Sequence, residues 1–167
     1  LSVVPELLKA RKIDVDYLVR YSNAAWLVID APGTTEHGLF ARDREGKALV
    51  WETVTERAVA YDAKGASAAL SGRFDLGGGR FAVPCFQLLA ETYLDERYSP
   101  ENVAPETGVS ADTIRGLAAE IARVAFEEEI FVHQPWTDVR GERHSGFTGR
   151  PVSFHAMRGI SAHSNGF

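Results

Sequence analysis

Helical patterns and short apolar runs alternate along this chain, and their order constrains the fold more than any other feature. The clearest helical pattern runs from Ala111 to Phe126, where Ser110 supplies an N-cap and apolar residues recur at helical spacing. Its expected buried stripe consists of Ile114, Leu117, Ala118, Ile121, Val124 and Ala125. Short apolar runs at 26–30 and 130–132 are typical of strands. This alternation predicts an α/β domain with a layered, partly parallel sheet flanked by helices.

The N-terminal half adds two short helices and a β-hairpin excursion to this pattern. Residues 5–11 have the pattern of the end of a helix, and Asp14 is expected to cap a second helix over 15–21. A polar turn at 43–46, closed by a glycine, separates two β-prone runs and predicts the hairpin. Residues 53–80 are rich in alanine, glycine and charge, so weak strands and loops are expected there.

The C-terminal half is expected to contain more helix. The sequence predicts a helix over 85–96 and then a shorter one that Ser99 caps and Gly108 ends. Residues 133–149 have the composition of a polar loop, and residues 152–157 that of a last strand.

Size and composition allow one domain of ordinary dimensions and exclude several classes of protein. The 167 residues are 45% hydrophobic, which is a globular mix. The elements divide into the end of an α/β domain with its hairpin and irregular region at 1–82, and a helix-rich α/β segment at 83–167, and the two can form one unit. No apolar run reaches the ~20 residues that a membrane span needs. The net charge of −5 and the lack of a basic patch argue against a nucleic-acid partner.

Few side chains indicate catalysis by their spacing. Cys85 is the single cysteine, and it is more typical of a small buried residue than of a nucleophile. Four histidines lie in the last third of the chain, but their spacing is not that of a metal site: His133, His144, His155 and His163. There is no GxSxG elbow and no phosphate-binding loop. The sequence therefore predicts no catalytic and no metal-ligating residue.

The loop after the last predicted strand is the best place for a ligand. Ligands of open α/β sheets bind at the carboxyl ends of strands. The candidate cofactor-binding residues in this loop are Arg158, Gly159, Ser161, His163, Asn165 and Gly166. The glycines allow close approach of the backbone, and Arg158 could bind a phosphate through two hydrogen bonds. A polar loop without a ligand is the alternative.

Four segments of the sequence match motifs of one known family. They are IDVDYLVRYSNA at 13–24, GLFARDREGK at 38–47, YSPE with TGVSADTI at 98–114, and GISAHSNG at 159–166. In this order they resemble segments of molybdopterin oxidoreductases of the dimethyl-sulfoxide-reductase type. The region 53–80 takes no part in the resemblance.

The resemblance implies that the chain is an internal fragment of a large catalytic subunit. The parent would hold molybdenum through two molybdopterin guanine dinucleotides, and it would be a thiosulfate or polysulfide reductase, a nitrate reductase or a related enzyme. This fragment would supply part of the cofactor-binding scaffold, with the loop 159–166 beside the cofactor. It would bind no cofactor and turn over no substrate alone.

The partners implied are the remainder of the parent chain and, in the parent complex, iron–sulfur and membrane subunits. An excised piece would also self-associate through apolar surface that its neighbours would otherwise cover.

Two alternatives stay open at this stage. The chain could be a stand-alone α/β nucleotide-binding module without redox activity, or an interaction domain in which Trp51 and Trp136 anchor the interface. The sequence names neither a substrate nor a compartment.

Overall fold

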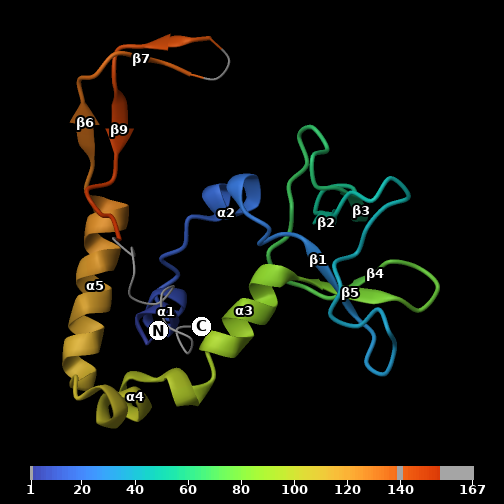
Figure 1. The fold of residues 1–167 in the computed structure, drawn as a ribbon, viewed down its shortest axis with the longest axis horizontal. Coiled ribbons are helices and arrows are strands. Elements are labelled where there is room, and N and C mark those ends of the chain that lie inside the picture. The colour runs from blue at the N-terminus through green and yellow to red at the C-terminus, as the bar shows by residue number, and fades with distance from the viewer. Residues whose placement is uncertain (1, 139–140, 155–167) are drawn as a thin grey trace, which may run out of the picture.

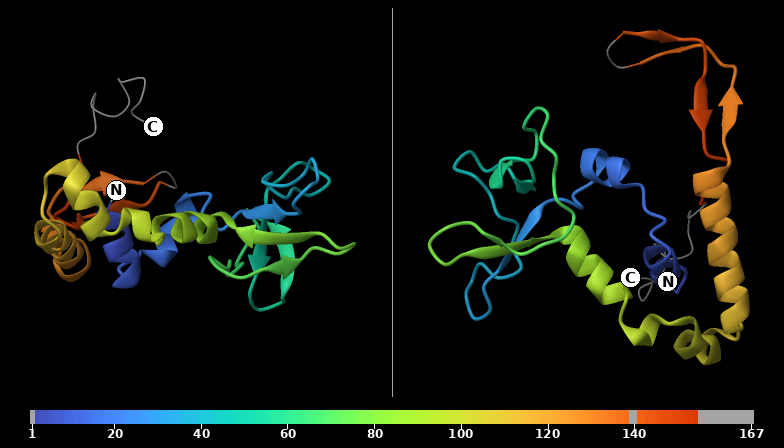
Figure 2. Two further views of the ribbon diagram at one scale, coloured as in Figure 1. Left: turned by 90° about the horizontal axis from the view of Figure 1, so that it is seen from below. Right: turned by 180° about the vertical axis from the view of Figure 1, so that it is seen from behind.

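A helical lobe and a β-rich lobe lie next to each other in the computed structural model, which describes residues 2–138 and 141–154 (Figure 1). The helical lobe contains α1 (Val3–Lys9), η1 (Glu96–Tyr98), α4 (Pro100–Thr107) and α5 (Ala111–Glu127). The β-rich lobe contains β1 (Leu27–Asp30), β2 (Leu49–Glu52), β3 (Arg57–Ala60), β4 (Phe74–Asp75) and β5 (Phe81–Pro84). The helices α2 (Val15–Tyr21) and α3 (Cys85–Tyr93) lie on the two paths that connect the lobes. Figure 2 shows that the two lobes form an open, flattened arrangement.

The β-rich lobe is built around a three-stranded antiparallel sheet in the order β1-β5-β4. Its core contains Leu27, Ile29, Ala41 and Ala82, all of which are buried. The two-stranded sheet β2-β3 packs against this core, where the rings of Trp51 and Phe74 stack with centroids 4.5 Å apart.

The predicted hairpin turn is confirmed. The side chain of Asp43 accepts hydrogen bonds from the backbone N–H groups of Glu45 and Lys47, each at 2.9 Å. Gly46 has a φ of 83°, a conformation that glycine adopts without strain. The residues before the turn form isolated bridges, through Phe40 and Arg42, rather than a regular strand.

The predicted helix caps are confirmed as well. Asp14, Ser99 and Ser110 each accept a hydrogen bond from a backbone N–H in the first turn of the following helix. Gly108 ends α4 with a φ of 70°. These boundaries follow from local chemistry, since each cap satisfies an N–H that the helix leaves unpaired.

The buried stripe of α5 is narrower than predicted. Ile114, Ala118 and Ala122 are buried, whereas Leu117 is 54% exposed. The helix α1 packs against α5, and it is only seven residues long. A partner this short covers one line of residues along α5, so the expectation that Leu117 is buried is wrong.

The mixed α/β class is confirmed, but the expected partly parallel sheet is wrong. Each ladder in the described part of the chain is antiparallel. The strand β5 lies at the centre of the main sheet, and the sequence did not indicate it. It ends at Pro84, directly before α3, and proline is tolerated at a strand end because it lacks only one ladder donor.

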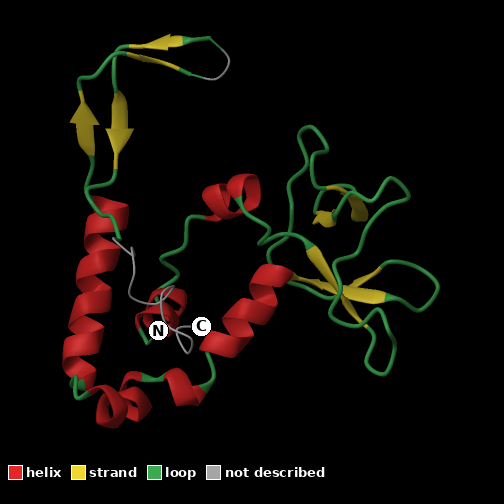
Figure 3. Ribbon diagram, in the orientation of Figure 1, coloured by secondary structure: helices red, strands yellow, loops and turns green. Residues whose placement is uncertain are grey.

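The strand expected at 130–132 is confirmed, whereas residues 133–149 were predicted as a polar loop, and that prediction is wrong. A C-terminal arm projects from α5 as one long, bent hairpin, in which β6 (Ile130–Val132) pairs with β9 (Phe147–Gly149) nearer α5 and β7 (Trp136–Thr137) pairs with β8 (Arg143–His144) nearer the tip (Figure 3). Gly146 permits the close approach, because a Cβ there would lie 2.4 Å from the carbonyl oxygen of Val132. Residues 152–154 form no strand, and the rest of the predicted last strand, 155–157, lies outside the described residues.

Within the described ranges, none of the helices combines the length and the apolar character required to span a membrane. The division of the chain at residue 82 stays a prediction.

Candidate functional site

The predicted cofactor loop lies outside the described residues. This holds for all six of its candidates: Arg158, Gly159, Ser161, His163, Asn165 and Gly166. Their role stays a prediction. Among the cavities in the described part of the chain, two lie beside β1 or the segment that leads into it.

The first cavity lies where α2 ends beside the β2-β3 sheet. Its volume is about 390 Å³. Its lining residues are Val19, Arg20, Tyr21, Ser22, Asn23, Trp26, Val50, Tyr61, Ala66 and Ala68. Five of them, residues 19–23, belong to the first of the sequence motifs, so this motif forms one wall of a cavity.

Local hydrogen bonds set the shape of that wall. The hydroxyl of Ser22 donates to the carbonyl oxygen of Leu18 at 2.6 Å and accepts from the N–H of Ala24 at 3.2 Å. These bonds turn the chain sharply out of α2 and into the segment before β1. Trp26 and Tyr61 both line the cavity, and their ring centroids lie 5.4 Å apart.

The chemistry of this cavity suits a flat ring that carries a polar or anionic group. Trp26 and Tyr61 offer aromatic surface for stacking. Arg20 forms no ion pair within the described ranges, so its guanidinium is available to an anion.

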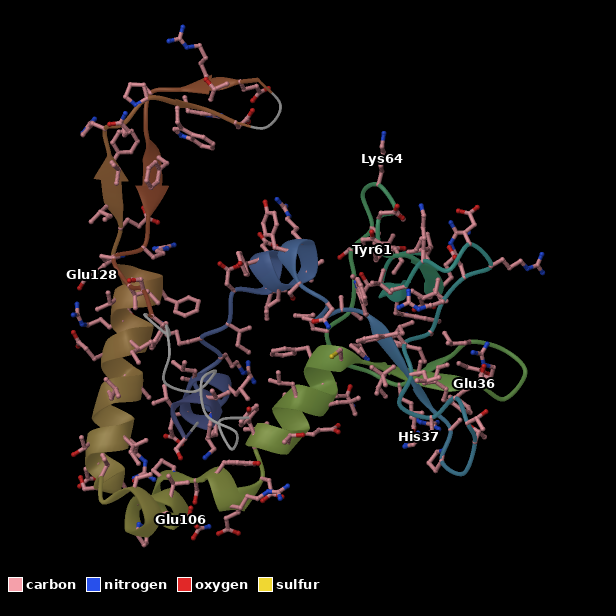
Figure 4. The ribbon with its side chains drawn as sticks, viewed as in Figure 1. Glu36, His37, Tyr61, Lys64, Glu106 and Glu128 are labelled. Carbon is pink, nitrogen blue, oxygen red and sulfur yellow. The ribbon has the colours of Figure 1, made fainter. Side chains whose placement is uncertain are left out.

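The second cavity, of about 400 Å³, lies between the β1-β5 sheet and α3. Asp30 and Arg73 pair across its wall at 2.8 Å, and the guanidinium of Arg73 lies 3.8 Å from the ring centre of Phe81. His37 accepts a hydrogen bond from the N–H of Ala31 through Nδ1, at 3.2 Å. Figure 4 shows Tyr61 and His37 on different sides of the β-rich lobe, so the two cavities are separate.

Sequence reasoning missed the residues of both cavities. For the second cavity, the sequence contains one local indication: the turn at Pro32–Gly33 follows β1 and leads to His37, which lines the cavity. The partners Arg73 and Gln87 come from far along the chain, and no local pattern could have brought them to the same wall.

Glu52 is the described carboxylate whose ionisation is most perturbed. Its side chain accepts hydrogen bonds from the hydroxyl of Thr55 and from the backbone N–H groups of Thr55, Val54 and Ser67. These bonds, with the hydroxyl contributing most, lower the pKa of Glu52 from 4.5 to about 2. Because Glu52 connects the turn after β2 to the loop that contains Ser67, we assign it a structural role.

One group of metal-ligating side chains converges within the described ranges. Asp138, Glu142 and His144 bring their ligand atoms within 4.8 Å of one another near the end of the arm. Three successive glutamates at the end of α5 form ion pairs instead: Glu127 with Lys12, Glu128 with Arg123 and Glu129 with Arg150.

Taken together, these features define a mixed α/β segment with ring-sized cavities. No family model matches the chain. Over 177 aligned residues it is 44% identical to a sulfite dehydrogenase subunit of Allochromatium vinosum. The alignment covers the whole chain and 18% of that protein, so the chain spans less than a fifth of the relative that it matches.

The identification as a member of the dimethyl-sulfoxide-reductase type is therefore wrong. The finding that overturns it is the match to a protein named as a sulfite dehydrogenase. The structure shows why the motifs misled: Asp14, Ser99, Gly108 and Ser110 begin or end helices. Such residues recur wherever a helix needs a cap. The more general expectation, that the chain resembles a segment of a larger oxidoreductase, agrees with this match.

Proposed function

We propose that this chain is one segment of a larger oxidoreductase subunit that oxidises sulfite, and that it serves there as scaffold rather than as a catalyst by itself. The observation that carries this proposal is the 44% identity over the full chain to a sulfite dehydrogenase subunit. Oxidation of sulfite combines it with one water and yields sulfate, two protons and two electrons. An acceptor outside this chain must take the electrons.

The cofactor that we propose for the whole subunit is molybdenum held by molybdopterin guanine dinucleotide, which would supply the two-electron oxygen transfer. The described cavities do not fit such a dinucleotide as a whole. Their volumes of about 390 and 400 Å³ lie in the lower part of the range that single small ligands occupy. We therefore assign no part in cofactor chemistry to these two cavities. We propose that the loop 158–166 contacts the cofactor.

Loss of molybdenum from a loop variant tests this assignment. In the full-length subunit, we expect Asn165→Ala to lower the molybdenum content per polypeptide, because it removes hydrogen-bonding groups beside the cofactor. The matched control is Gln134→Ala, which removes an exposed amide from the arm. Equal molybdenum content in both variants would count against the loop.

A second candidate function is binding of a nucleotide without redox chemistry. The aromatic side chains and the free guanidinium of Arg20 in the first cavity favour it. Titration of the 167-residue chain with guanosine monophosphate, followed by tryptophan fluorescence, tests it. Saturable quenching that Arg20→Gln weakens would support this second function, and an unchanged spectrum would exclude it.

A further inference from the structure

The turn that joins β7 to β8 brings three metal-ligating side chains together, and neither the proposed function nor the matched relative accounts for them. They are Asp138, Glu142 and His144, and their ligand atoms all lie within 4.8 Å of one another. One imidazole and two carboxylates form a mixed ligand set, which differs in its chemistry from a patch of acidic surface.

Two hydrogen bonds hold the carboxylate of Asp138 close to the backbone of Glu142. The N–H of Asp138 donates to the carbonyl oxygen of Glu142, and the N–H of Glu142 donates to Oδ1 of Asp138, both at 3.0 Å. Gly141 closes the turn with a φ of 86°, which other residues rarely adopt. The position of the Asp138 carboxylate and of the Glu142 backbone is thus set by the chain itself.

Contacts outside the cluster orient the imidazole. His144 lies opposite Trp136 in the ladder, and the two rings stack with centroids 4.7 Å apart and planes 23° from parallel. The indole N–H of Trp136 donates to the carbonyl oxygen of Gly146 at 3.2 Å, which holds the indole in place. In this orientation Nε2 of His144 lies 3.2 Å from Oδ2 of Asp138.

The spacing of these atoms matches that of ligands around one ion. Zinc binds nitrogen and carboxylate oxygen at about 2.0–2.2 Å, so neighbouring ligands of a tetrahedral site are about 3.3–3.5 Å apart. The 3.2 Å between His144 and Asp138 is close to this separation. The carboxylate of Glu142 lies within 4.8 Å of the other two ligand atoms, and because Glu142 is exposed, a rotation of its side chain can bring it to the same separation.

We propose that Asp138, Glu142 and His144 bind a divalent transition-metal ion of the zinc class, with water completing the coordination. Imidazole with carboxylate favours such ions over magnesium or calcium, which take oxygen ligands. The ion would replace the hydrogen bond between His144 and Asp138 and clip the two strands together. Since β7 and β8 are two residues long and such hairpins are marginal in water, the clip would stabilise the end of the arm.

Calorimetric titration of the 167-residue chain with zinc chloride tests the proposal without reference to sulfite or molybdenum. We expect His144→Gln and Glu142→Gln each to weaken the site at least about tenfold, because each removes one of three ligands. The matched controls are His133→Gln and Glu129→Gln, which change the same residue types outside the cluster. Both should bind as the wild type does.

A second measurement keeps the test independent of folding. Cobalt should produce visible absorption bands in the wild type and should quench the fluorescence of Trp136, which stacks on His144. The bands should persist in Trp136→Phe, whereas most of the quenching should disappear. Zinc binding that is equal in all four variants, or no binding by the wild type, would overturn the proposal and leave only a hydrogen-bonded pair.

Discussion

At the scale of single residues, Glu52 shows how a buried charge becomes part of the fold. Its carboxylate is 7% exposed, yet hydrogen bonds from Thr55, Val54 and Ser67 satisfy it. A carboxylate with this many donors stays ionised in acid, and its lowered pKa of about 2 reflects that.

The lowered pKa predicts how the stability of a Glu52→Gln variant depends on pH. The carboxylate stabilises the fold fully above the ordinary pKa of 4.5, and its contribution is lost as the pH falls through about 2. We therefore expect Glu52→Gln to be less stable than the wild type at pH 7, with the difference shrinking between about pH 4.5 and 2. Thermal unfolding across this range measures it, with the exposed Glu106→Gln as control. A difference independent of pH would refute the account.

Leu27 allows a second prediction at this scale, because its side chain is fully buried in the β-rich core. We expect Leu27→Ala to lower the free energy of unfolding by about 2–5 kcal/mol, through lost burial and the cavity left behind. Leu117→Ala is the matched control: its side chain is 54% exposed, and its change should stay within about 1 kcal/mol. Denaturation with urea measures both, and similar losses would contradict the assigned core.

At the scale of elements, the cap of α5 is the signal that the sequence states most clearly. The hydroxyl of Ser110 accepts from the N–H of Thr113 at 3.2 Å. We expect Ser110→Ala to destabilise the chain by about 1 kcal/mol and Ser110→Asp to restore most of that, because aspartate caps as well as serine does. Urea denaturation of the two variants tests this. Equal stability of Ser110→Ala and the wild type would show that the cap does not stabilise the chain.

Helices could be predicted here because their signals are local, whereas several strands could not. Asp14, Ser99, Gly108 and Ser110 each act on the neighbouring turn. By contrast, β5 is a strand because it pairs with β1, which lies far earlier in the chain. In the arm, the apolar run of β6 could be recognised, but β7, β8 and β9 depend on ring contacts and on Gly146, none of which produces a periodic pattern in the sequence.

The same reasoning explains how little of the candidate sites was foreseen. The loop 158–166 was chosen from its composition and lies outside the described residues. The cavity beside Trp26 needs Tyr61 from another sheet, and the cluster at Asp138 needs the register of β7 with β8. Both are properties of tertiary pairing, which spacing along the chain does not encode.

At the scale of the whole molecule, the open arrangement leaves large apolar side chains exposed. Leu117 lies on α5, while Phe131, Trp136 and Phe147 lie on the arm, and each is more than 40% exposed. Exposed apolar surface of this kind favours association. We expect the 167-residue chain to self-associate in sedimentation velocity, and Leu117→Glu to shift it toward monomer. A clean monomer in the wild type would contradict this prediction.

We propose that this chain belongs to a larger subunit that oxidises sulfite, on the basis of its similarity to a sulfite dehydrogenase subunit. Purified full-length subunit, supplied with sulfite and ferricyanide as acceptor, tests it most directly. We expect sulfate to appear in step with the loss of sulfite, with two ferricyanide ions reduced for each sulfate formed. Absence of any sulfite-dependent reduction of the acceptor would contradict the claim.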